Sequence, residues 1–157
     1  MAFDPGTECI DHLNVYSKSK SPLGRLLTNF ARARIVTEDG AFMSVEGYWY
    51  WLSIPDGTPG KDDLRRLWGY RAKCRGRELR KAAGRTRFEE RFEDKIRMAV
   101  RYKLRHADAS ALMLPEGELP LAHYYVFDGR VRDVGPKFDW LVAVWREELD
   151  SARAMRA

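Results

Sequence analysis

The sequence has few of the residues that build disulfides or metal centres. It contains two cysteines, Cys9 and Cys74, and three histidines, and none of them shows metal-ligand spacing. We therefore expect two free thiols and no metal. No apolar run approaches the roughly 18 residues needed to span a bilayer. The first ten residues also lack the basic-then-apolar pattern of a signal peptide. These absences predict a cytoplasmic protein that does not bind membranes.

Basic residues exceed acidic ones, with 28 lysines and arginines against 23 aspartates and glutamates. The 157-residue chain, long enough for one domain with a sizeable core, has a net charge of +5, which indicates an anionic partner. The basic excess is concentrated between Arg65 and Arg105, where arginine outnumbers lysine, as suits bidentate contacts with phosphate. The alternative is a solvated helix face whose acidic residues pair with their basic neighbours.

Aromatic residues are concentrated around a single acid. Five of the ten residues from Phe42 to Trp51 are aromatic, against 12% of the whole chain. Because a buried tyrosine hydroxyl or tryptophan N–H must find a partner, a plain core seldom collects so many such rings. The run therefore favours a ring-walled pocket with Glu46 at its mouth, and ordinary core packing is the alternative.

The hydrophobic pattern predicts an α+β fold: one mainly helical domain around a small antiparallel sheet. Turn chemistry at Asp39-Gly40 and Asp128-Gly129 predicts two hairpins, and Ser44 and Asp108 are expected helix N-caps. The expected strands are 12–16, 32–37, 41–43 and 121–127, the last returning through 131–134. The expected helices are 44–53, 61–69, 70–83, 87–104, 108–113 and one that starts at Pro136. Residues 17–24 are an expected loop, and 1–11 and 151–157 are expected loose termini.

Several short motifs resemble the NADAR (YbiA-like) family. That family carries a Ser-Asn-Phe element before a hairpin and a Ser-Val-Glu element that opens an aromatic helix. The matching residues here are Thr28-Asn29-Phe30, with threonine for serine, and Ser44-Val45-Glu46. Further similarity lies in Ser21-Pro-Leu-Gly-Arg25, in Tyr70-Arg71-Ala72-Lys73, which resembles an Ala-Lys element, and in residues 119–125 with Gly129 and Asp133. The family's tryptophan in the helix after Arg91, and its Trp-Gly-x-Gly and Gly-x-Asn elements, have no counterpart.

The resemblance implies a YbiA-like fold over most of residues 13–149 and an N-glycosidase activity. Described members cleave a ribosyl–amine bond in riboflavin-pathway intermediates or remove ADP-ribose from guanine bases. We therefore expect an enzyme that hydrolyses a ribosyl C–N bond, most notably between ADP-ribose and guanine in a nucleoside or nucleic acid. No cofactor is implied.

Cleavage of a ribosyl C–N bond builds positive charge on the sugar, which a fixed carboxylate can stabilise, or the carboxylate can orient a water. Glu46 is the candidate, and a first-turn acid that favours the helix dipole is the alternative. Asp133 is a candidate second carboxylate, whereas Asp128 is explained by the turn. The remaining candidates would bind the ligand through phosphate contacts, polar contacts or ring packing. They are Arg25, Asn29, Phe30, Ser44, Tyr48, Trp49, Lys73 and Tyr125.

Two other function classes fit the same residues. One is a non-catalytic nucleic-acid-binding module, in which the basic segment from Arg65 to Arg105 contacts phosphates while rings such as Tyr70 stack on bases. The other is an ADP-ribose sensor that binds without cleaving. The sequence leaves both monomer and dimer open.

Overall fold

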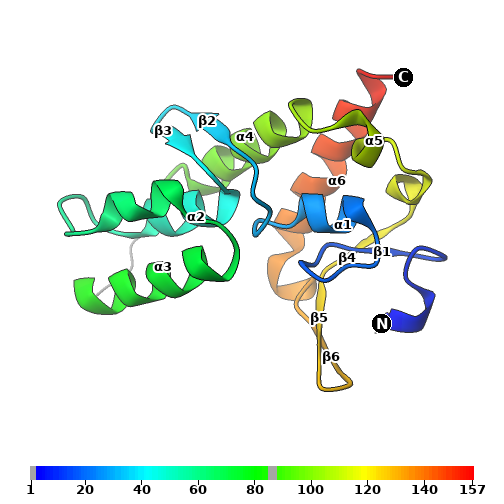
Figure 1. Ribbon diagram of the computed structural model, residues 1–157, viewed down its shortest axis with the longest axis horizontal. Coiled ribbons are helices and arrows are strands. Elements are labelled where there is room, and N and C mark those ends of the chain that lie inside the picture. Colours follow the sequence, from blue (N-terminus) through cyan, green and yellow to red (C-terminus); the bar gives the residue numbers. More distant parts are fainter. Residues whose placement is uncertain (1–2, 85–87) are drawn as a thin grey trace. The chain divides into compact units, whose positions relative to one another are not determined.

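The computed structural model describes residues 3–84 and 88–157, which form two compact units (Figure 1). The central unit consists of residues 29–103. The terminal unit combines the two ends of the chain, residues up to 28 and from 104 onward. The expected α+β class is confirmed, and the expected single domain stays a prediction. No helix among the described residues has both the length and the apolar character needed to cross a membrane.

The central unit consists of a hairpin and helices. Strands β2 (Ile35–Thr37) and β3 (Gly40–Phe42) pair antiparallel, with Ile35 opposite Phe42, through the expected turn at Asp39-Gly40. Gly40 has a φ of 106°, which explains why glycine follows the aspartate. The helical elements that follow are α2 (Val45–Ser53), the 3-10 helix η2 (Lys61–Arg66), α3 (Gly69–Ala83) and α4 (Phe92–Arg105).

Two glycines allow the helices of the central unit to approach one another closely. A Cβ at Gly76 of α3 would collide with the ring of Tyr50 on α2, and a Cβ at Gly47 would collide with the carbonyl oxygen of Leu64. Because neither glycine has a side chain, α2 packs directly against α3 and η2. Tyr50 and Leu64 then share a buried apolar cluster with Ile54 and Leu79.

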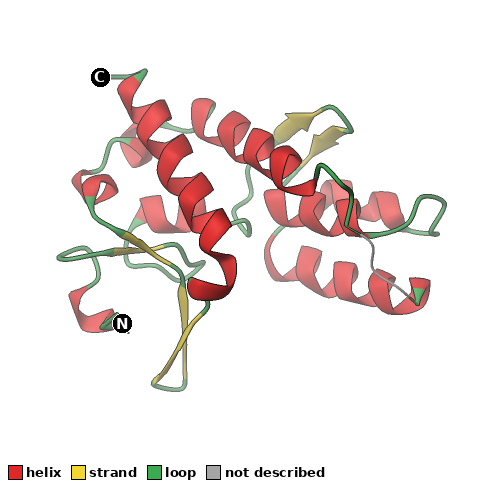
Figure 2. Ribbon diagram, turned by 180° about the vertical axis from the view of Figure 1, so that it is seen from behind, coloured by secondary structure: helices red, strands yellow, loops and turns green. Residues whose placement is uncertain are grey.

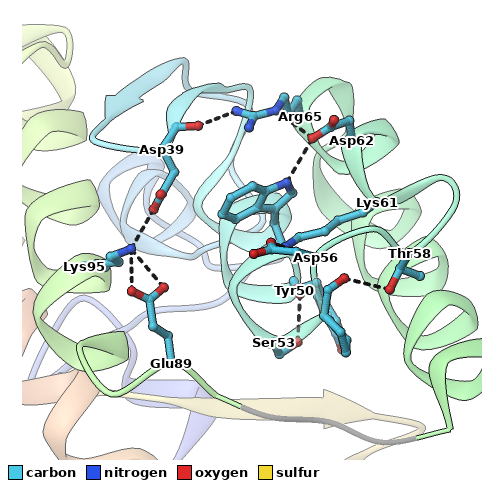
Figure 3. A network of polar contacts seen from close by, with 12 residues as sticks. Asp39, Tyr50, Ser53, Asp56, Thr58, Lys61, Asp62, Arg65, Glu89 and Lys95 are labelled. Atoms are coloured by element: carbon cyan, nitrogen blue, oxygen red, sulfur yellow. Dashed lines mark hydrogen bonds and ion pairs between the residues drawn. The ribbon is translucent and has the colours of Figure 1, made fainter.

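A buried polar network ties the hairpin of the central unit to α4 (Figure 3). The Lys95 side chain is 5% exposed, and its Nζ lies 2.9 Å from Oδ2 of Asp39 and 2.7 Å from Oε1 of Glu89. The Tyr48 hydroxyl donates to the same Asp39 oxygen over 2.7 Å. Burial alone would raise the pKa of Asp39, but the hydrogen bonds from Tyr48 and Lys95 outweigh it and lower that pKa. Asp39 is therefore an ionised structural residue.

The terminal unit contains the remaining elements (Figure 2). Two short strands far apart in sequence pair in parallel, with Leu13 opposite Leu121, and a second pair forms the expected hairpin, with Tyr124 opposite Asp133. The strands are β1 (Leu13–Asn14), β4 (Leu121–Ala122), β5 (Tyr124–Phe127) and β6 (Arg130–Asp133). The helices are α1 (Pro22–Leu27), α5 (Ala109–Leu112) and α6 (Asp139–Ala154), with 3-10 turns at Pro5–Thr7, Pro115–Glu118 and Pro136–Phe138.

The termini correct the expectation of loose ends within the described residues. The buried carboxylate of Glu8 accepts hydrogen bonds from the backbone N–H groups of Asn14 and Lys20 and from the Ser19 hydroxyl. At the other end, Arg153 donates to the carbonyl oxygens of residues 112 and 114. Charged side chains therefore hold both ends in place, through contacts with distant residues that the local sequence does not indicate.

Three other boundaries differ from expectation. The second half of the expected loop 17–24 is the start of α1, because Ser21 caps it and Pro22 begins it. In place of the expected single sheet, the described residues form three separate two-stranded sheets, one of them parallel. The helix expected over 61–69 is a 3-10 helix that ends at Arg66. Residues 1–2 and 85–87, which include the expected helix start at Arg87, lie outside the described residues.

Candidate functional site

Three chain segments meet at the N-terminus of α2. The backbone N–H of Glu46 donates to the carbonyl oxygen of Asn29 over 2.9 Å. Ser44 is the expected N-cap: its hydroxyl accepts from Gly47 N–H at 3.0 Å and donates to the Leu67 carbonyl at 2.8 Å. The Ser44 hydroxyl therefore fixes both the start of α2 and the segment before α3. Glu46 lies in the first turn of the helix that this cap begins.

Glu46 is half-buried, and its carboxylate has no hydrogen-bond or ion-pair partner in the described part of the chain. Among residues 3–84 and 88–157, no hydrogen bond or ion pair to its side chain is found. Burial raises the pKa of Glu46 to about 7, against the opposing charges of Lys73, Arg80 and Arg77 on α3. Although the side chain retains some solvent access, burial dominates because those cations act at a distance rather than by contact. The group can therefore gain or lose a proton near neutral pH.

The cations on α3 are held by aromatic rings. The guanidinium of Arg80 lies 4.3 Å above the Tyr50 ring, and its Nε donates to the Ser53 hydroxyl over 2.8 Å. Burial lowers the pKa of Arg80. The Lys73 ammonium lies 5.8 Å from the centre of the Phe30 ring. These contacts position positive charge around the carboxylate of Glu46 without neutralising it.

Two buried polar atoms of the central unit lack hydrogen-bond partners in the described part of the chain. They are Oδ1 of Asn29 and Nη2 of Arg80. Buried polar atoms are normally satisfied, and the exceptions gather where function requires them. Asn29 contacts Glu46 through its backbone, and the Arg80 charge acts on Glu46, so both unsatisfied atoms belong to residues associated with this carboxylate.

The structure brings together five of the candidate residues in the central unit: Asn29, Phe30, Ser44, Glu46 and Lys73. Sequence reasoning missed Tyr50, Arg77 and Arg80. Tyr50 follows Glu46 by four residues, the spacing that places two side chains on one helix face. That spacing is the signal that could have found it.

Tyr48 corrects an expectation. Its ring is 1% exposed and packs 4.7 Å from the ring of Phe42, while its hydroxyl binds Asp39. Two residues along a helix turn a side chain by about 200°, so Tyr48 points away from the Glu46 face. Trp49 is half-buried, and its ring meets Phe92 edge-on at 4.8 Å. Most of the aromatic run is therefore core, as the alternative interpretation had it.

The other three candidates belong to the terminal unit, where each is engaged locally. Nη1 of Arg25 donates to the Ser19 carbonyl over 2.6 Å. Oδ1 of Asp133 accepts from Gly135 N–H over 2.9 Å, a turn-forming bond. The Tyr125 ring packs 5.6 Å from the ring of Tyr16. Their proposed roles in binding and catalysis stay predictions.

No three histidine, cysteine, aspartate or glutamate side chains in the described ranges gather in a group that could hold a metal ion. Both Cys9 and Cys74 are free thiols. Asp39 and Asp62 also contact α2, but each is held in hydrogen bonds and ion pairs. Within the described ranges, the groups left for chemistry beside the start of α2 are the Glu46 carboxyl group and the nearby cations of α3.

The arrangement of elements is a YbiA-like α+β fold. The structure matches the NMR structure of the E. coli protein YbiA with a TM-score of 0.60 and 20% sequence identity, over 93% of this chain and 87% of YbiA. The chain matches no protein-family profile and no curated protein sequence. A likeness at this level of identity establishes the fold alone.

The raised pKa of Glu46 predicts a pH-dependent effect of Glu46→Gln on stability. The folded-state pKa of about 7 exceeds the ordinary 4.5, so the protonated form stabilises the fold below pH 4.5, and this contribution is lost as the pH rises through 7. Glutamine cannot ionise. At pH 8 the free energy of unfolding of the variant should therefore exceed that of the parent by about 1–2 kcal/mol. This is less than the full pKa shift implies, because the group is partly solvated. At pH 4 the two free energies of unfolding should be almost equal.

Urea unfolding of both proteins at each pH measures this difference in the free energy of unfolding. An equal difference at the two pH values would contradict the prediction.

Proposed function

We propose that the protein hydrolyses a ribosyl C–N bond, with Glu46 as the catalytic residue. The observation that carries this is a carboxyl group with a pKa of about 7 and no contact partner among the described residues, at the capped start of α2. A structural acid is normally ionised and paired, whereas a general base works best with a pKa near the operating pH. The YbiA-like fold and the NADAR-like motifs that carry Asn29 and Glu46 support the same activity.

In the proposed reaction the ionised Glu46 accepts a proton from a water that attacks the anomeric carbon. The C–O bond forms, the C–N bond breaks, and the leaving nitrogen takes a proton from solvent. The carboxylate also offsets the positive charge that develops on the ribose ring. Because the ionised form is the active one, kcat/KM should rise with pH through about 7.

The cations on α3 support a phosphate-bearing substrate. Lys73 and Arg77 both act on Glu46 through their charge, and both can contact phosphate oxygens. ADP-ribose attached to a guanine base, in a nucleoside or nucleic acid, meets these requirements, as does a ribosylamine phosphate. The first is the substrate we favour, since it combines a diphosphate with an N-glycosidic bond.

A direct test incubates the protein with ADP-ribosylated guanosine, ADP-ribosylated DNA and ribosylamine phosphates. Release of free ADP-ribose or ribose phosphate, followed by mass spectrometry, is the expected result. Comparison of the three rates identifies the substrate class. If all three compounds are recovered intact, the proposed hydrolysis is wrong.

A nucleic-acid-binding module is a second candidate, supported by the outer face of α3. Tyr70 is 69% exposed there, and Arg71, Arg77 and Lys81 are also exposed. Other basic residues instead pair locally: Arg75, for example, binds both Asp63 and Glu78. Affinity for nucleic acid should fall steeply with salt, whereas affinity for free ADP-ribose should fall much less.

A further inference from the structure

Trp68 occupies a position that local helix chemistry does not explain. It is the N-cap of α3 but makes no capping hydrogen bond, although serine, threonine, aspartate and asparagine are preferred there. The side chain is 40% exposed, which is costly for so large an apolar ring. Neither helix capping nor burial in the core therefore explains why position 68 is a tryptophan.

One face of the Trp68 ring carries a cation. The guanidinium carbon of Arg32 lies 4.6 Å from the ring centre. Arg32 is itself exposed and forms no ion pair with an acid among the residues that the structure describes. The pair is thus a flat, partly exposed ring with a positive charge beside it that no described acid compensates.

The backbone around Trp68 lies close to the surroundings of Glu46. The preceding residue, Leu67, accepts the hydroxyl of the α2 cap Ser44. The following residue, Gly69, has a φ of 60°, and a Cβ there would lie 3.8 Å from the Phe30 carbonyl. Trp68 therefore follows a residue that is bonded to the α2 cap and precedes a glycine that lies near the Phe30 carbonyl oxygen, close to the segment that contacts Glu46.

We propose that Trp68 and Arg32 form a subsite for the nucleobase of a nucleotide ligand, with the base stacked on the open part of the indole ring and a phosphate contacting Arg32. This inference rests on the proposed function for its link to Glu46, but the binding itself does not require turnover. A flat base needs an aromatic surface, and its phosphate needs an unpaired cation; the pair offers both. An apolar peptide would leave the Arg32 charge uncompensated.

The test measures binding of GMP and of ribose 5-phosphate, which lacks a base, by isothermal titration calorimetry. Stacking of a base on an aromatic side chain contributes about 1–3 kcal/mol, so Trp68→Ala should weaken GMP binding by roughly 5- to 150-fold. Binding of ribose 5-phosphate should change by less than about threefold. Trp68→Phe, which keeps a ring, should retain most of the affinity for GMP.

Three further variants make the test specific. Arg32→Ala should weaken binding of GMP more than binding of guanosine, because only GMP has a phosphate. Phe127→Ala removes a ring that is 81% exposed in the terminal unit and should leave GMP binding unchanged. Glu46→Gln should lose turnover but keep GMP binding, which separates failure of the subsite from failure of the proposed reaction.

The source of the base is decided by comparing GMP with a short single-stranded oligonucleotide at two salt concentrations. Tighter, strongly salt-dependent binding of the oligonucleotide assigns the subsite to bases within nucleic acid, and equal binding assigns it to free nucleotides. The subsite is refuted if Trp68→Ala weakens GMP and ribose 5-phosphate equally, or weakens neither.

Discussion

Replacement of Glu46 by glutamine is expected to lower kcat for the ribosyl substrate by at least about 100-fold. Glutamine preserves the shape of the side chain and leaves the Ser44 cap intact, but it cannot accept a proton from water. It also offers no negative charge to the developing oxocarbenium ion. Steady-state assays with ADP-ribosylated guanosine measure the loss, with the residual rate compared across pH 6–8.

Glu93 provides a matched control, because it is also an acid in the first turn of a helix, α4. An acid that only favours the helix dipole contributes about 0.3–1 kcal/mol, so Glu93→Gln should leave the rate nearly unchanged. If Glu46→Gln proved as active as Glu93→Gln, Glu46 would be a helix-dipole residue and not the catalytic one.

The second large effect is expected from Asp39→Ala, which should lower the free energy of unfolding by about 3 kcal/mol. The change removes the acceptor of the Tyr48 hydroxyl and one of the two acids that bind Lys95. Lys95 is almost fully buried, so water cannot replace the lost carboxylate as its partner. Urea unfolding monitored by circular dichroism measures the difference.

Asp62→Ala is the corresponding control. Asp62 also accepts from a ring, through Trp51 Nε1, and also pairs with a cation, Arg65, but its side chain is 78% exposed. Exposed ion pairs contribute about 0–1 kcal/mol, so Asp62→Ala should lower the free energy of unfolding only slightly. Equal losses for the two aspartates would mean that burial does not determine the strength of the Asp39 network.

The sequence predicted the elements whose causes are local. Ser44 caps α2 and Asp108 caps α5 as expected, because a side-chain oxygen meets a backbone N–H within a few residues. The turn at Asp128-Gly129 also forms as expected. By contrast, the pairing of Leu13 with Leu121 depends on residues far apart in sequence, and no local pattern indicates it. The anchoring of the N-terminal segment through Glu8 was missed for the same reason.

The candidate site shows the same division. The motifs located Asn29, Glu46 and Lys73, which the fold places in one unit. The direction of each ring along α2 depends on which face of the helix packs against α3. Four consecutive aromatic residues cover every face, so the sequence pattern does not define that face. Tyr48 was therefore expected in the site in place of Tyr50. Arg80 was hidden among many similar arginines, because only the fold shows that its guanidinium packs on the Tyr50 ring and bonds Ser53.

The discontinuous terminal unit has a consequence for synthesis of the protein. The parallel partner of β1 is β4, so residue 13 has no strand to pair with until residue 121 has left the ribosome. At about 5–20 residues per second, that delay is on the order of 5–20 s. The central unit, whose residues are contiguous, is complete earlier. Nascent chains should therefore acquire protease resistance in the middle before their own beginning becomes protected.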